Sequence, residues 1–125
     1  MPAKHKDQDE PTLLELVLRV QGDFRRRLEP IRVTPLQAGV LLFLRGHAGA
    51  KLRDAATTLG VRLPTLSVVV KDLVRKRWVI KRRSVTDTRA VCLSLSRQGQ
   101  GLALRIKDHV RNVKNDLASK KGELS

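Results

Sequence analysis

The most informative segment of the chain is Lys81-Arg-Arg-Ser-Val-Thr-Asp-Thr-Arg-Ala-Val-Cys-Leu-Ser-Leu-Ser-Arg-Gln-Gly99. It opens with three cations, crosses a polar turn that contains Asp87 and Arg89, and returns as residues 91–95, in which apolar side chains alternate with others. A period of two is typical of a strand with one face in the core. The stretch therefore predicts a two-stranded hairpin with basic residues toward its free end, a shape that can enter a DNA groove.

The sequence upstream of the hairpin predicts two helices joined by a tight turn. Residues 52–59 form the first helix, Gly60 provides the positive φ that a helix end favours, and the second helix begins near Leu63 and Pro64. The second helix has an inward stripe of Leu66, Val69, Val70 and Leu73, and its outward side chains are Thr65, Ser67, Val68 and Lys71 or Asp72. This arrangement is typical of a helix-turn-helix, whose second helix reads DNA.

Two more helices are predicted before this centre. Residues 12–29 show apolar side chains at steps of three and four, with Thr12 as the cap and Pro30 as the stop. Residues 36–45 follow Thr34-Pro35, end at Gly46, and are apolar on nearly every side. We expect this second helix in the centre of the core.

A long helix is predicted from residue 96 to about residue 118. Its narrow apolar seam consists of Leu102, Ile106, Val110, Val113 and Leu117. Such a seam requires a partner helix. It packs either on the first helix of the same chain alone or, together with that helix, against a second copy in a two-fold dimer.

The charge distribution indicates a polyanionic partner. The 125 residues include 26 Lys and Arg against 12 Asp and Glu, a formal net charge of +14. Residues 62–97 alone hold ten cations and two acids, a net charge of +8, so more than half of the excess lies around the helix-turn-helix and the hairpin. Because a merely solubilising excess would be spread more evenly, nucleic acid is the favoured partner.

The sequence offers little support for other classes of protein. A single cysteine, Cys92, cannot form an internal disulfide, and no apolar run approaches the roughly 20 residues of a membrane-spanning helix. His5, His47 and His109 form no spaced metal-ligand pair, and no nucleophile motif or phosphate loop is present. The scarcity of aromatic residues argues against single-strand or RNA recognition by base stacking. We expect a cytoplasmic, nucleoid-associated protein that is not an enzyme and uses no metal or cofactor.

Several short motifs connect these elements in a characteristic order. They are Thr34-Pro-Leu-Gln, Ala55-Ala56-x-x-Leu59-Gly60-Val61, Pro64-Thr65-Leu66-Ser67, Leu73-Val-Arg-Lys, Asp87-x-Arg89 and Leu95-Ser96-x-x-Gly99. Over residues 34–105 the chain thereby resembles the MarR family of bacterial winged-helix transcriptional regulators. The resemblance implies that residues 63–77 enter the major groove, that Arg89 lies at the wing, and that the terminal helices form a homodimer.

The expected fold is mainly α-helical with a small antiparallel β-wing: a winged helix-turn-helix flanked by long N- and C-terminal dimerisation helices. In one compact domain, residues 1–11 would be a flexible arm, 12–33 the first dimerisation helix, 34–95 the DNA-binding region, and 96–125 the C-terminal dimerisation helix and tail. The expected dimer interface comprises Leu13, Leu16, Val17, Val20, Phe24, Ile106, Val110, Val113 and Leu117.

The expected DNA-binding residues lie on the second helix and the wing. They are Arg62, Pro64, Thr65, Ser67, Val68, Lys71, Arg75, Lys81, Arg82, Arg83, Asp87 and Arg89. Arg89 would enter or flank the minor groove, and Asp87 would orient it. The other cations would mostly contact phosphates, and the alternative for each is an ordinary solvated charge.

This sequence departs from the family pattern at three places. Arg77 stands where the family usually has glycine at the end of the reading helix, so we expect a strained or rearranged cap. Val68 replaces a common polar or basic residue and leaves apolar contact, for instance with a thymine methyl group. The sequence also ends near the fifth major helix, which implies a reduced dimer surface.

The favoured function is that of a sequence-specific regulator of transcription, more often a repressor in this family. It would bind a palindromic duplex as a homodimer and be released by a small-molecule effector of unknown identity. Two alternatives stay open at this stage. One is a weakly specific architectural DNA-binding protein, and the other is a winged helix that binds another protein.

Overall fold

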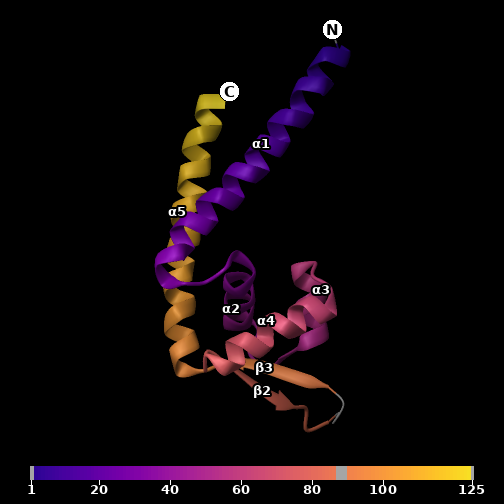
Figure 1. The fold of residues 1–125 in the computed structure, drawn as a ribbon, viewed down its shortest axis with the longest axis vertical. Coiled ribbons are helices and arrows are strands. Elements are labelled where there is room, and N and C mark those ends of the chain that lie inside the picture. Colours follow the sequence, from indigo (N-terminus) through magenta and orange to yellow (C-terminus); the bar gives the residue numbers. More distant parts are fainter. Residues whose placement is uncertain (1, 87–89, 125) are drawn as a thin grey trace.

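The chain folds into a small lobe from which two long helices project (Figure 1). The computed structural model describes the backbone of residues 2–86 and 90–124 and the side chains of residues 12–86 and 90–115. The elements are α1 (Pro2–Leu28), a 3-10 turn (Glu29–Ile31), α2 (Pro35–Gly46), β1 (Ala50–Lys51), α3 (Leu52–Leu59), α4 (Leu63–Arg75), β2 (Val79–Arg83), β3 (Val91–Leu95) and α5 (Arg97–Leu124). The predicted fold class, mainly helical with a small antiparallel wing, is confirmed.

The sheet has three antiparallel strands in the order β1-β3-β2. In the hairpin, Val79 pairs with Leu95 and Arg83 pairs with Val91. Strand β1, whose Ala50 pairs with Leu93, was not predicted from the sequence. A strand of two residues is too short to show an alternating pattern, so only its pairing with β3 reveals it.

Helix α2 lies at the centre of the core, as its apolar sequence predicts. It contacts α1, α3, α4, α5 and β3, and Val40, Leu41 and Leu44 are almost fully buried. Its N-terminus forms a capping box, in which Thr34 Oγ1 accepts from the Gln37 backbone N–H and Gln37 Oε1 accepts from the Thr34 N–H. These reciprocal bonds satisfy amide groups that a helix end otherwise leaves without partners.

The first helix is longer than predicted. It begins at Pro2, so Thr12 lies inside α1 rather than at its cap, and residues 2–10, expected as a loose arm, continue the helix. The apolar period marks only the part of a helix that has a core-facing stripe, and polar residues extend a helix without such a signal. The end agrees to within one residue, because α1 stops at Leu28 and the chain turns through Glu29–Ile31.

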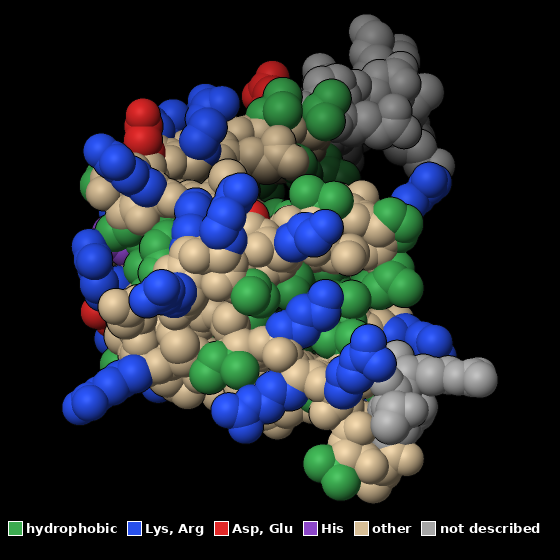
Figure 2. All heavy atoms as spheres, turned by 60° about the horizontal axis from the view of Figure 1, so that its bottom comes forward, with side chains coloured by type: hydrophobic (Ala, Val, Ile, Leu, Met, Phe, Trp, Pro, Cys, Tyr) green, Lys and Arg blue, Asp and Glu red, His purple; other side chains and the backbone are tan. Residues whose placement is uncertain are grey.

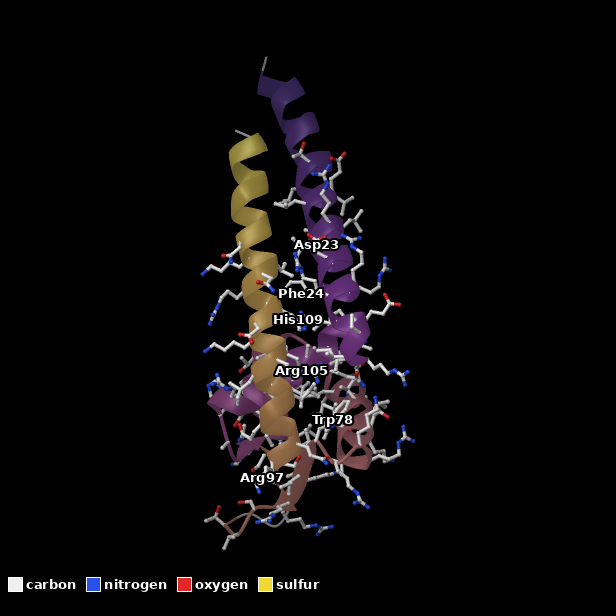
Figure 3. The ribbon with its side chains drawn as sticks, turned by 90° about the vertical axis from the view of Figure 1, so that its left-hand side faces the viewer. Asp23, Phe24, Trp78, Arg97, Arg105 and His109 are labelled. Carbon is white, nitrogen blue, oxygen red and sulfur yellow. The ribbon has the colours of Figure 1, made fainter. Side chains whose placement is uncertain are left out.

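The apolar seam of α5 is occupied within the chain. Ile106 and Val113 are buried, and the half-buried Phe24 and Val110 pack against the core. Figure 3 shows α1 and α5 side by side, with Phe24 and His109 between them. In the single chain Ile106 and Val113 therefore have almost no surface left to bury against a second copy, and their assignment to a dimer interface stays a prediction. Leu117 lies outside the described side chains.

Candidate nucleic-acid interface

Helix α4 presents one face to the core and the other to solvent. Gly60, with φ +65°, ends α3, and α4 begins three residues later at Leu63. The inward positions are as predicted: Leu66, Val70 and Leu73 are buried and Val69 is half-buried. Arg62, before the helix, and the side chains of the opposite face are exposed: Pro64, Thr65, Ser67, Val68, Lys71 and Arg75. The tight turn therefore leaves a continuous outward surface on α4 that is free of core contacts.

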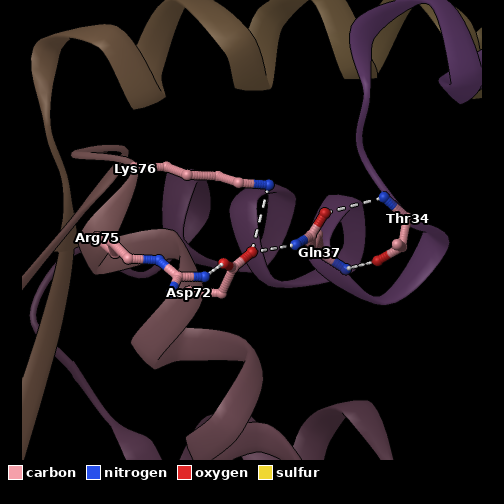
Figure 4. Close-up of polar contacts among 5 residues, drawn as sticks. All are labelled: Thr34, Gln37, Asp72, Arg75 and Lys76. Carbon is pink, nitrogen blue, oxygen red and sulfur yellow. Dashed lines mark hydrogen bonds and ion pairs between the residues drawn. The ribbon is translucent and has the colours of Figure 1, made fainter.

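Asp72 does not belong to this outward surface. Its carboxylate accepts a hydrogen bond of 2.8 Å from Gln37 Nε2 of α2 and pairs with Lys76 Nζ at 3.3 Å and with the Arg75 guanidinium (Figure 4). The hydrogen bonds from Arg75 and Lys76 hold the pKa of Asp72 below its ordinary value. The helical period placed Asp72 at the border of the outward face, and only its contact with α2 shows that it turns inward.

The end of α4 has the left-handed residue that the position requires. Arg77 has φ +64°, its N–H bonds the Val74 carbonyl, and the Trp78 N–H bonds the Leu73 carbonyl at 3.0 Å. These two bonds define the turn that commonly ends a helix, with arginine in the place where glycine is usual. The left-handed φ of Arg77 thus agrees with the strained cap that we expected, and both hydrogen bonds of the turn are nevertheless formed.

A second joint connects the end of α4 to the start of α5. Ser96 Oγ donates to the Arg77 carbonyl at 2.6 Å and accepts from the Gly99 N–H at 3.0 Å, so it caps α5 and holds the preceding turn at once. A Cβ atom on Gly99 would lie 2.0 Å from the Trp78 carbonyl oxygen. The Leu-Ser-x-x-Gly motif therefore has a structural role: it fixes the long helix against the base of the wing.

The wing places further cations beside α4. Lys81, Arg82 and Arg83 are exposed on β2, and the Ser84 N–H bonds the Ala90 carbonyl at 2.9 Å beyond the last strand pair. Val85, beyond this bond, is fully exposed. Asp87 and Arg89, the predicted tip, lie outside the described residues.

Basic side chains dominate the face of the molecule that carries these elements. Figure 2, which brings the lower side of Figure 1 forward, shows Lys and Arg side chains spread over this face and few acidic ones. This face therefore carries an excess of positive charge. A surface of this sign attracts a polyanion at long range.

A hollow of about 380 Å³ lies beside the wing. It is lined by Lys51 of β1, by Leu52, Arg53 and Asp54 at the start of α3, by Leu63 of α4, and by Ala90 and Val91 of the wing. Lys51 and Arg53 are exposed cations that the sequence analysis did not single out. Only the pairing of β1 with β3, which is not visible in the sequence, brings these two residues beside the wing.

Within the part of the chain whose side chains are described, no group of three His, Cys, Asp or Glu residues could hold a metal ion. His47 stacks on Phe43 and contacts its carbonyl oxygen, and Cys92 is half-buried on β3. Among the same residues, no helix has an apolar segment long enough to span a bilayer.

The comparisons with known proteins point to one family. A sequence model of the MarR family matches residues 33–90, which include α2, α3, α4 and β2. The transcriptional repressor CouR, solved on a 23-mer DNA duplex, superposes with a TM-score of 0.76 at 28% identity, over 90% of this chain and 89% of that one. The chain is thus similar to MarR-family regulators in both sequence and fold.

Two further proteins show the same likeness. The Staphylococcus aureus MepR-DNA complex superposes with a TM-score of 0.83 at 22% identity, over 89% of this chain and 82% of MepR, which establishes the shared fold. The HTH-type transcriptional repressor MdtR of Bacillus subtilis is 26% identical over 88 residues, 70% of this chain and 57% of MdtR. The matched segment thus spans little more than half of the length of MdtR.

Proposed function

We propose that this chain is a sequence-specific MarR-family regulator of transcription that binds double-stranded DNA and represses its targets. The observation that carries the proposal is the outward face of α4, where polar side chains and Lys71 stand free of the core beside a basic wing. In a winged helix such a face is the part that reads base edges in the major groove. The DNA duplex bound to CouR and the DNA complex of MepR support the assignment by similarity.

The individual roles follow from position on this surface. Thr65, Ser67 and Lys71 would reach base edges or phosphates, and Arg62, Pro64 and Val68 would line the same groove. Arg75, Lys81, Arg82 and Arg83 would neutralise phosphates, and Arg89, oriented by Asp87, would reach the minor groove. Such a protein acts by binding alone, without catalysis, metal or cofactor, and is cytoplasmic and nucleoid-associated.

We propose that the functional unit is a homodimer. Four large apolar side chains of α1 are 43–63% exposed, namely Leu13, Leu14, Val17 and Leu18. They recur at one-turn spacing, so they form one apolar strip on the projecting part of the helix. A two-fold dimer built on this strip would present two copies of α4 to half-sites about one helical turn, roughly 10 bp, apart on a palindromic operator.

Release of DNA by a small molecule is part of the same proposal. A hollow of about 390 Å³ lies where α1 meets the start of α2, lined by Leu18, Gln21, Gly22, Arg25 and Pro35. A compound bound there would contact both the projecting helix and the lobe that carries α4. Arg25 favours an anionic compound at this place.

The proposal is tested by selecting duplexes from a random-sequence pool at near-physiological salt. The winning sequence is then titrated against scrambled DNA at several salt concentrations. We expect the selected sequence to be two-fold symmetric and to bind at least about 1,000-fold more tightly than scrambled DNA. Binding without enrichment of any sequence would instead assign an architectural role, and the absence of duplex binding would assign a protein-interaction role.

A further inference from the structure

The outward face of α4 carries a large apolar side chain at its centre. Val68 is 70% exposed, and it lies about one helical turn from Thr65 on one side and from Lys71 on the other. The core does not use it, because Leu66, Val70 and Leu73 fill the inward face. An exposed valine between polar neighbours contributes little to folding, so its surface is available to a ligand of the helix.

Val68 lies beside both apolar and polar groups. Val68 and the half-buried Val69 line a hollow of about 640 Å³ between α4 and the start of α2. Among the polar side chains that line it, Gln37 of α2 donates to Asp72 of α4 and Arg75 pairs with the same carboxylate, whereas Lys71 is exposed. The strongest feature that Val68 offers to a partner is therefore its pair of methyl groups.

We propose that Val68 selects thymine at one position of each half-site by contact with its 5-methyl group. This inference rests on the proposed function, in which the outward face of α4 enters the major groove. Thymine is the base of unmodified DNA that presents a methyl group there, whereas the other bases present donors and acceptors. A valine side chain forms no hydrogen bonds. It therefore gains binding free energy from contact with the thymine methyl group, whereas it leaves the donors and acceptors of the other bases without partners.

The test uses the duplex selected in the preceding experiment. Each thymine is replaced singly by deoxyuridine, which removes the methyl group and keeps the base pair and its O4 acceptor. We expect one position per half-site at which this change weakens binding about four-fold, the effect of burying one methyl group. At that position, replacement by 5-methylcytosine should weaken binding less than replacement by cytosine.

Protein variants connect the effect to Val68. The Val68→Ala variant should bind the thymine and deoxyuridine duplexes with nearly equal affinity, and Val68→Thr, which keeps one methyl group, should lie between it and the wild type. Leu104→Ala removes a 49% exposed apolar side chain from α5 and serves as the matched control, in which the four-fold ratio stays. Thermal unfolding verifies that each variant is folded, which the exposure of Val68 predicts.

The outcomes separate this inference from the proposed function. A selected duplex that shows no sensitive thymine, or one whose sensitivity is unchanged in Val68→Ala, would overturn the role of Val68 and leave the sequence-specific regulator intact. A pool from which no sequence is enriched would overturn both proposals.

Discussion

At the scale of single residues, the junction of α4, β2 and α5 depends on two backbone positions with opposite demands. Gly99 lies against the Trp78 carbonyl, where no side chain fits. Arg77 takes a left-handed conformation at φ +64°, which an L-residue adopts at a cost of about 1–2 kcal/mol. The first position thus requires glycine and the second tolerates its absence, because the Arg77 carbonyl and N–H are both held by hydrogen bonds.

Replacing Arg77 by glycine should stabilise the protein. The change removes the left-handed strain but increases the freedom of the unfolded chain, so the free energy of unfolding should rise by up to about 1 kcal/mol in urea titrations. Lys71→Gly is the control, since it also removes a cation from α4 but at a right-handed position inside the helix, and it should lower stability by about 1 kcal/mol. A loss of stability in Arg77→Gly would contradict the inference that the left-handed conformation of Arg77 is strained.

Replacing Gly99 by alanine should have the opposite effect. Its Cβ would overlap the Trp78 carbonyl oxygen at 2.0 Å, so α5 must shift, and we expect a loss of about 1–3 kcal/mol by thermal or urea unfolding. Gly101→Ala is the matched control in the same helix, because its Cβ would meet no atom within 4 Å, and it should raise stability by about 1 kcal/mol. Equal effects of the two variants would disprove the close approach.

At the scale of elements, the position of the reading helix is fixed by a polar contact as well as by its apolar stripe. Gln37, which caps α2 with Thr34, also donates to Asp72 of α4, and Asp72 in turn holds Arg75 and Lys76. This chain of bonds connects the start of the central helix α2 to the end of α4. It adds a polar contact to the apolar stripe that orients α4 on the core.

The contribution of Asp72 should depend on pH in a defined direction. Its pKa is lowered in the folded state by Arg75 and Lys76, so its stabilising effect is complete above the unfolded value of about 3.9 and disappears as the pH falls through the lower folded value. In urea titrations Asp72→Asn should therefore be less stable than the wild type at pH 7, and the difference should shrink below about pH 4. Asp108→Asn controls for the change in net charge. A difference that stays constant down to pH 3 would show that Asp72 acts through its shape alone.

At the scale of the whole molecule, α1 and α5 extend beyond the lobe, and their packing on each other uses only part of their apolar surface. Ile106 and Val113 of α5 are buried within the chain, whereas Leu13, Leu14, Val17 and Leu18 of α1 remain 43–63% exposed. An apolar strip of this kind on a projecting helix is typical of an oligomer interface.

The double variant Leu14→Gln/Leu18→Gln should therefore dissociate the dimer. We expect its dimer dissociation constant to rise at least about 100-fold in sedimentation experiments, since each protomer loses two leucines that the proposed dimer would bury. Binding to a palindromic duplex should weaken in parallel, because one reading head contacts only half of the site. Leu104→Gln, with its similar exposure on α5, should remain dimeric. An unchanged dimer in the double variant would place the interface elsewhere.

The elements whose signals are local could be predicted from the residues alone. The cap at Thr34 and the apolar run of α2, the helical period of α4, the left-handed turn at Gly60 and the alternation in β3 all involve residues within a few positions of one another. Such signals do not depend on the rest of the fold, so the winged-helix order and the outward face of α4 could be predicted together with the family.

The contacts between these elements could not be predicted from local signals. The direction of Asp72 depends on Gln37, 35 residues away, and β1 exists because β3 pairs with it. The apolar period of α5 did not show what covers its seam, and within the chain Ile106 is buried against the core. A local pattern shows that a surface is apolar or charged, but it does not show which surface covers it. The covering surface comes from distant segments, so the contact and its free energy arise only when the whole chain is packed.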